Sequence, residues 1–309
     1  MPVPVVIAFT ESYFIPAATC LQSMLAHTTA DSKFRVICLL TEDLSESKKE
    51  ALRLLDAKGQ IDYTFIRLDE ADLGKDIYVD PRYTIAASYR LMIASILPQY
   101  DKIIYTDCDI IIRTDIARLY RETQFADEYV AAVYESPLPF QDEHIRKVGC
   151  TPGKYFNSGF LLMNLAKIRE EHVEERFMNE LRTDYLEFPD QDVLNKVCQG
   201  RVKPLAPIYN GIRTFFLPQY REYFLLNYTE NDLAAVHESG TIHYTGSKPW
   251  QSFTVMFYIW WKYYYTLPQA VRREGQPNIK WKLTYDLVFS HALGRGMVEA
   301  VRYIYRKIR

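Results

Sequence analysis

Two aspartates separated by one residue, Asp107 and Asp109, carry the clearest chemical signal in the chain, and they lie between two apolar runs. Carboxylates at this spacing converge on one hard cation where the backbone bends, and Mg²⁺ or Mn²⁺ prefers oxygen ligands shared between carboxylates and substrate phosphates. The pattern alone is weak, because the chain repeats it at Asp190 and Asp192. A solvated turn after a strand is the alternative interpretation.

A second cluster follows a short apolar run and places His243, Gly246 and Lys248 within six residues. A neutral imidazole is a metal ligand that favours Mn²⁺ over Mg²⁺. A lysine meets a phosphate as a point charge, and a glycine lets the backbone approach a diphosphate closely. The alternative is a histidine that is merely structural.

The elements that must position these residues alternate between strand and helix over the first hundred residues. Apolar runs predict strands at 3–9, 34–40, 61–68 and 102–106. Helical spacing predicts helices between them, one starting from a capping box at residues 47–50 and one at 86–97 that Pro98 ends. This order indicates an α/β fold with a doubly wound, mostly parallel central sheet, which binds ligands at the carboxyl ends of its strands.

The middle of the chain is less regular. It predicts strands at 129–134 and 160–165 and helices at 168–186 and 192–197. A short strand at 241–244 leads into the histidine cluster. No internal repeat or low-complexity segment is present.

Composition limits the class of protein. The 309 residues are 48% hydrophobic and 25% charged, as in a globular protein, and the net charge of -2 does not indicate a nucleic-acid partner. The N-terminus is interpreted as a strand and not as a signal peptide, and no run is long enough to span a bilayer. The five cysteines form no C-x-x-C pair, so we expect neither a disulfide framework nor a zinc site, and a reducing cytoplasm fits best.

Taken together, four stretches make the chain resemble the retaining glycosyltransferases of family 8, which include bacterial lipopolysaccharide galactosyl- and glucosyltransferases and glycogenin. They are residues 6–13, residues 89–91 with 101–109, residues 155–165 with 190–195, and residues 243–250. The resemblance implies a GT-A type nucleotide-diphospho-sugar transferase fold. It covers roughly residues 3–250, so we expect a catalytic domain at 1–250 and an aromatic, basic helical extension at 251–309.

The resemblance also implies roles for particular residues. Asp107, Asp109 and His243 match ligands of Mn²⁺ (or Mg²⁺), which holds the donor diphosphate. Donor or cofactor contacts are implied for Ala8, Thr10, Tyr13, Arg90, Asp107, Cys108, Asp109, Gly246 and Lys248. The donor sugar and reacting face are implied for Asn157, Asp190 and Gln191. The implied reaction is transfer of galactose or glucose from a UDP-sugar to a glycan or lipid-linked saccharide of the lipopolysaccharide type.

Several departures and alternatives remain. Residues 10–12 are Thr-Glu-Ser, where relatives often carry two acids and an asparagine. Glu135 stands where many relatives carry aspartate. The interval from His243 to Lys248 is one residue shorter than in some members. Structural interpretations also exist: Tyr13 as packing, Arg90 as a salt bridge, Asn157 as a turn cap and Asp190 as a helix N-cap. Rival functions are a non-catalytic nucleotide-sugar-binding protein, and a metal-dependent phosphoesterase or nucleotidyltransferase.

The last third of the chain predicts a further partner. It is rich in aromatic residues and ends with Arg295, Arg302, Arg306, Lys307 and Arg309. This composition favours an amphipathic segment that contacts anionic lipid or a lipid-linked acceptor at the inner face of the membrane. A solvated helix whose aromatic residues pack onto the core is the alternative.

Overall fold

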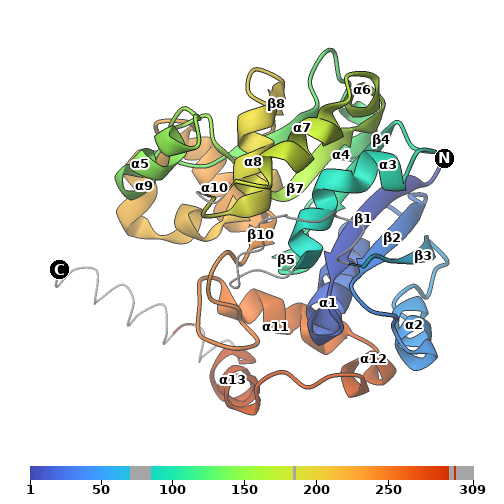
Figure 1. The fold of residues 1–309 in the computed structure, drawn as a ribbon. Helices are drawn as coiled ribbons and strands as arrows, with labels where there is room; N and C mark the ends of the chain where they lie inside the picture. Colours follow the sequence, from blue (N-terminus) through green and yellow to red (C-terminus); the bar gives the residue numbers. More distant parts are fainter. Residues whose placement is uncertain (70–84, 184–185, 292–295, 297–309) are drawn as a thin grey trace.

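A seven-stranded sheet forms the centre of the computed structural model, which describes residues 1–69, 85–183, 186–291 and 296 (Figure 1). The strand order is β3-β2-β1-β4-β7-β6-β8. The strands are β1 (Val3–Phe9), β2 (Phe34–Leu40), β3 (Ile61–Arg67), β4 (Lys102–Thr106), β6 (Val130–Tyr134), β7 (Phe156–Asn164) and β8 (Val202–Pro204).

The sheet is mostly parallel, as the sequence predicts. β1 pairs in parallel with β2 and β4, β2 with β3, and β6 with β8, whereas β7 runs antiparallel to β4 and β6. All seven residues of β1 are buried, which explains its continuous apolar run: helices cover both faces of such a sheet. Because β7 is reversed, its first residues lie at the carboxyl end of β4, where Asp107 donates its backbone N–H to the carbonyl of Gly159 at 2.7 Å.

A three-stranded sheet stands beside the carboxyl end of β4. It consists of β5 (Ile110–Ile111), β9 (Gly211–Ile212) and β10 (Ile242–His243), with β10 between the other two. In the antiparallel β5–β10 register His243 lies opposite Ile110. This pairing carries His243 across more than 130 residues of sequence to the strand that begins directly after Asp109.

Thirteen α-helices within the described residues pack around these sheets. They are α1 (Phe14–Ala26), α2 (Glu46–Arg53), α3 (Ile93–Ile96), α4 (Ile116–Glu122), α5 (Pro139–Lys147), α6 (Leu165–Glu170), α7 (Val173–Glu180), α8 (Pro189–Val197), α9 (Arg221–Phe224), α10 (Glu230–Ser239), α11 (Phe257–Thr266), α12 (Gln269–Arg273) and α13 (Ile279–Thr284).

Three helix predictions are wrong in detail. The helix expected at 86–97 is a 3-10 helix, η3 (Ile85–Met92), followed by the single turn of α3. The one expected at 168–186 is divided into α6 and α7 by His172, whose φ of 52° is incompatible with a right-handed helix. The helix α2 is capped by Ser45, which accepts a hydrogen bond from the N–H of Lys48, so the box predicted at 47–50 does not form.

The C-terminal helices lie beside the N-terminal ones, with α11 against α1 and α12 against α2 (Figure 1). Trp260 and Trp261 on α11 are buried in the same core as β1 and α1, so the aromatic residues of this segment pack inward. In the part of the chain that the structure describes, no helix combines the length and apolarity needed to cross a bilayer. The five terminal basic residues lie outside the described residues.

Candidate active site

A cavity of 590 Å³ opens at the carboxyl ends of β1, β4 and β6, where the sheet rule places a ligand. Its volume lies within the range of small-molecule sites. All the site residues predicted from the sequence line it: Ala8, Thr10, Tyr13, Arg90, Asp107, Cys108, Asp109, Asn157, Asp190, Gln191, His243, Gly246 and Lys248. The structure therefore brings together in one place residues that the sequence spreads over 240 positions.

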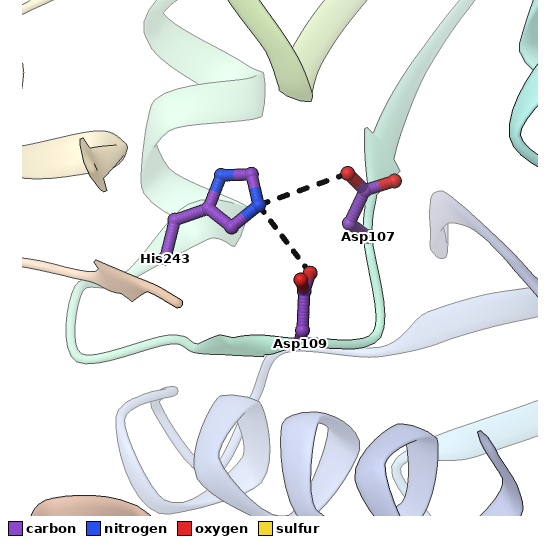
Figure 2. A group of neighbouring side chains, drawn as sticks. All are labelled: Asp107, Asp109 and His243. Atoms are coloured by element: carbon purple, nitrogen blue, oxygen red, sulfur yellow. Dashed lines mark ion pairs between the residues drawn. The ribbon is translucent and has the colours of Figure 1, made fainter. Parts of the chain in front are cut away.

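Asp107, Asp109 and His243 line this cavity, and their side chains point toward one another (Figure 2). The imidazole Nε2 points between the two carboxylates, 3.8 Å from Asp107 Oδ2 and 3.3 Å from Asp109 Oδ1. One ligand atom from each residue lies within 4.8 Å of the others, a spacing that could hold a metal ion, and no other such group occurs among the residues described. The buried positions of Asp109 and His243 make a solvated turn the weaker interpretation.

Lys248 gives this part of the cavity its positive charge. Its ammonium donates to Asp109 Oδ2 and, at 2.7 Å, to the carbonyl of Tyr244. Burial alone would raise the pKa of Asp109, but the charge of Lys248 and the contacts that Lys248 and His243 make with the carboxylate outweigh it and hold that pKa well below its usual range. Asp109 is therefore ionised at neutral pH.

Arg90 joins the aspartate cluster to the opposite wall. Its guanidinium lies 2.7 Å from Asp107 Oδ1 and 3.2 Å from Asp190 Oδ2, and it also donates to the carbonyl of Ser158 at 2.6 Å. The guanidinium also stacks on the ring of Tyr105 at 4.4 Å. Burial lowers the pKa of Arg90, yet the two aspartates raise it overall, so this cation is permanent. The salt-bridge interpretation of Arg90 is thus correct, and the same residue lines the cavity.

The far wall of the cavity is built from side-chain amides. Asn157 donates to Gln191 Oε1 at 3.0 Å and to Glu135 Oε1 at 3.3 Å, and Gln191 donates to the same Glu135 oxygen at 3.2 Å. Asp190 accepts from the hydroxyl of Ser158 at 2.9 Å. Asp190 is not the N-cap of α8, which is Phe188, so that alternative is wrong.

Comparison with known proteins identifies the family. The sequence profile described as Glycosyl transferase family 8 matches residues 4–254. This chain belongs to glycosyl transferase family 8. The glycosyltransferase enzyme expected from the sequence is thereby confirmed.

Two bacterial proteins are among the curated relatives of this family 8 glycosyltransferase. General stress protein A of Bacillus subtilis (strain 168) is 28% identical over 223 residues, which cover 68% of this chain and 74% of that protein. Lipopolysaccharide 1,2-glucosyltransferase of Escherichia coli (strain K12) is 29% identical over 223 residues, covering 67% of this chain and 62% of that protein. This family 8 chain therefore corresponds to only part of some relatives.

Solved structures share the fold of this family 8 enzyme. The galactosyltransferase LgtC, in complex with donor and acceptor sugar analogs, superposes with a TM-score of 0.71 at 22% identity, covering 88% of this chain and all of LgtC. The bifunctional glycosyltransferase WbbM gives a TM-score of 0.74 at 22% identity, covering 90% of this chain and 52% of WbbM. The GT-A type fold expected from the sequence is confirmed.

Several residues at or next to this glycosyltransferase cavity are not predicted from the sequence. Ser158 and Tyr105 line it, and Tyr105 donates its hydroxyl to Asp107 Oδ1 at 2.9 Å. Asn210 is fully buried, and its Oδ1 accepts a hydrogen bond from His243 Nδ1 at 3.1 Å. In the sequence, Glu135 stands out only as a departure from relatives. Its position directly after the apolar run at 129–134 was the available signal, because polar residues at strand ends face the ligand edge.

Glu135 makes the stability of this family 8 enzyme depend on pH. Burial raises the pKa of Glu135, although three side-chain amides and His243 partly oppose it. A raised folded-state pKa favours the folded protein below the ordinary value of 4.5, and this contribution is lost as pH rises through the folded-state pKa. We therefore expect Glu135→Gln to unfold at a higher temperature than the wild type at neutral pH.

The measurement is thermal unfolding of both proteins from acidic to neutral pH. The advantage of the variant should shrink as pH falls, because the protonated glutamic acid and glutamine are both neutral. A difference that does not change with pH would contradict the raised pKa of Glu135.

Proposed function

We propose that this enzyme transfers galactose or glucose, with retention, from a UDP-sugar to a glycan or lipopolysaccharide-type acceptor, and that it requires Mn²⁺. The observation that carries the proposal is the convergence of Asp107, Asp109 and His243 beside two cations, Arg90 and Lys248, in one cavity. Relatives named as lipopolysaccharide glucosyltransferases and the galactosyltransferase LgtC support this donor and acceptor class.

The three predicted ligands fit a divalent cation. Two oxygens and one imidazole nitrogen form a donor set that Mn²⁺ accepts more readily than Mg²⁺. Ligand atoms that share an octahedral ion at about 2.1 Å lie roughly 3.0–4.2 Å apart. The separations of 3.3 and 3.8 Å from His243 Nε2 fall within that span. The bound cation would supply Lewis-acid stabilisation to the departing diphosphate.

The basic side chains complete the donor site. Lys248 contacts the carboxylate of Asp109, which is also a proposed ligand of the ion. Its ammonium is therefore placed to neutralise a phosphate oxygen. Gly246 has a φ of 84°, which glycine adopts without strain, and it lines the cavity next to Lys248. Tyr13, half buried and packed edge-on to Trp250 at 5.9 Å, offers the remaining ring face to a uracil.

Retention is proposed to occur by attack of the acceptor on the same face that the diphosphate leaves, with a leaving oxygen taking the acceptor proton. The side chains near the proposed sugar support this route, because the polar atoms that could attack the sugar are already occupied by other contacts. The oxygen of Gln191 already accepts hydrogen bonds from Asn157 and the N–H of Ser158, and Asp190 is paired with Arg90. Trapping a covalent glycosyl adduct on the unmodified protein would refute this route.

The proposal is tested by screening purified enzyme with UDP-glucose, UDP-galactose, UDP-N-acetylglucosamine and GDP-mannose, with and without Mn²⁺. Metal-dependent release of UDP from a hexose donor, and sugar transfer to a lipopolysaccharide-type acceptor, are expected. Tight binding without release or transfer would support a non-catalytic binding protein. Cleavage of the diphosphate itself would support a phosphoesterase or nucleotidyltransferase.

We also propose that the enzyme acts in the cytoplasm and touches the inner face of the membrane through its C-terminal helices. Ile279, Leu283 and Leu287 recur every four residues over α13 and the following π-helix, η7 (Tyr285–Phe289). They are 64%, 49% and 77% exposed, and Lys280 and Lys282 lie among them. An exposed apolar stripe with flanking lysines suits an anionic lipid surface.

Charge placed on this stripe is expected to weaken membrane binding. The double variant Leu283→Glu, Leu287→Glu should bind phosphatidylglycerol-rich vesicles at least about tenfold less, because two leucines that become buried in the lipid contribute several kcal/mol. Sedimentation with vesicles measures the change. Leu226→Glu is the control, since Leu226 is 68% exposed but lies outside α13 and η7. Equal binding of all three proteins would contradict the proposal.

A further inference from the structure

Asn210 lies between the proposed metal ligand and the amide wall. It is fully buried and follows the 3-10 helix η4 (Pro207–Tyr209), just before β9. Its Oδ1 lies 3.1 Å from His243 Nδ1, and its Nδ2 lies 3.0 Å from Asn157 Oδ1. The buried amide of Asn210 is hydrogen-bonded on both sides. It therefore connects His243, a proposed metal ligand, to Asn157, a residue of the proposed sugar site.

The direction of these hydrogen bonds follows from the backbone of β7. The N–H of Gly159 lies 3.1 Å from one amide atom of Asn157 and can only donate, so that atom is the oxygen. The same oxygen also contacts Asn210, which must therefore present its NH₂ group. The other amide atom of Asn210 is then its oxygen, and it faces His243.

An oxygen at this position fixes the tautomer of His243. Because Asn210 Oδ1 can only accept, His243 Nδ1 carries a hydrogen, and Nε2 of the neutral ring has its lone pair free. That lone pair points between Asp107 and Asp109, as Figure 2 shows for the ring. The histidine is thus oriented as a ligand by a partner on its opposite edge.

A second branch reaches the reacting face by the same logic. The N–H of Ser158 donates to Gln191 Oε1 at 3.1 Å, so the NH₂ group of Gln191 is the one that faces Glu135. Asn157 donates from its NH₂ group to Gln191 Oε1, and its oxygen accepts from the NH₂ group of Asn210. One polarised chain of amides therefore runs from His243 through Asn210 and Asn157 to Gln191.

We infer that Asn210 is a positioning residue that holds His243 in its metal-binding tautomer and couples the metal site to the Asn157–Gln191 pair. This inference rests on the proposed function, because it takes the Asp107, Asp109 and His243 cluster as the site of a divalent cation. Asn210 itself lies behind the ring and acts through His243 and Asn157.

Two substitutions separate the two contacts of Asn210. Asn210→Asp keeps an acceptor for His243 but loses the donor to Asn157. We expect Mn²⁺ affinity within about threefold of wild type and a fall of at least tenfold in kcat. Asn210→Leu removes both contacts at similar volume. We expect Mn²⁺ affinity to fall by about 10- to 100-fold, as for other partners of metal-binding histidines, and kcat to fall as well.

Mn²⁺ affinity is measured by titration followed by electron paramagnetic resonance, which needs no turnover. In ¹⁵N-histidine-labelled protein saturated with diamagnetic Mg²⁺, long-range ¹H–¹⁵N spectra should show His243 with its hydrogen on Nδ1. Asn210→Leu should shift His243 toward a mixture of tautomers. Asn195→Ala is the control for lost packing, since Asn195 is equally a buried amide but contacts only backbone groups.

The outcomes are distinguishable. Wild-type Mn²⁺ affinity in Asn210→Leu, or a wild-type His243 hydrogen on Nε2, would overturn the role of Asn210 while leaving the proposed function intact. Failure of the wild-type protein to bind Mn²⁺ would instead remove the proposed metal site. Asn195→Ala should lower the unfolding temperature without changing Mn²⁺ affinity. An equal loss of affinity in that control would reduce Asn210 to a general packing role and overturn the inference.

Discussion

Gly159→Ala is expected to abolish sugar transfer while leaving the sheet folded. A Cβ at Gly159 would lie 2.2 Å from His243 Cε1 and 2.7 Å from Asp107 Oδ2. Both distances are far inside van der Waals contact, so the two predicted ligands must move apart. Displacements of this kind, on the order of 1 Å, cost about 10²-fold or more in an active site. We expect turnover to fall by at least about 10²-fold, with a parallel loss of Mn²⁺ affinity.

Steady-state transfer and Mn²⁺ titration measure this effect, with circular dichroism to verify the fold. Gly59→Ala is the matched control, because Gly59 has a φ of 63° and no neighbouring atom within 4 Å of the added Cβ. That substitution should cost about 1–2 kcal/mol of stability through backbone strain and leave transfer unchanged. Near-normal turnover in Gly159→Ala would show that the cluster does not hold the catalytic ion.

Asp109→Asn is expected to have the second largest effect. The substitution keeps the shape of the side chain but removes the negative charge that faces both His243 and Lys248. It also leaves the largely buried ammonium of Lys248 without its carboxylate. Loss of a metal ligand and of several kcal/mol of charge stabilisation predicts a fall in kcat/KM of about 10³-fold.

The comparison is made at saturating Mn²⁺ and across a range of metal concentrations. Asp115→Asn is the control, because Asp115 caps α4 by accepting from the N–H of Arg118 and asparagine caps helices equally well. This control should match the wild type in stability and transfer. If Asp109→Asn retained more than a tenth of wild-type kcat/KM, Asp109 would not be a ligand of the catalytic cation.

Several features of the protein are determined locally, and the sequence predicts them. β1 and β4 are continuous apolar runs because both faces of a parallel sheet are covered, so their positions can be recognised without neighbours. Asp107 and Asp109 follow β4 directly, which places them at the ligand-binding edge. What distinguishes these aspartates from an ordinary acidic turn is the combination of the four stretches that resemble family 8, since each motif alone is weak.

Helix boundaries show where local patterns are insufficient. The apolar spacing of residues 168–186 continues through His172, although the backbone there turns left-handed and starts a new helix. The start of α2 was misplaced because Ser45 and Ser47 are both plausible caps, and only Ser45 reaches the N–H of Lys48. Tertiary packing chooses among such alternatives, whose energies differ by about 1 kcal/mol.

The site as a whole depends on the tertiary structure. The β5–β10 pairing carries His243 to Asp109, and β7 presents Gly159 at the one point where a side chain would displace the predicted ligands. Asn210 and Glu135 carry no motif, since their importance lies in hydrogen bonds to residues between 22 and 56 positions away. The sequence alone determined strands β1 to β4, the acidic pair and the family. Only the folded chain decided which amides face which ligands, because hydrogen-bond direction is set by atoms that lie about 3 Å apart in space and not by spacing along the chain.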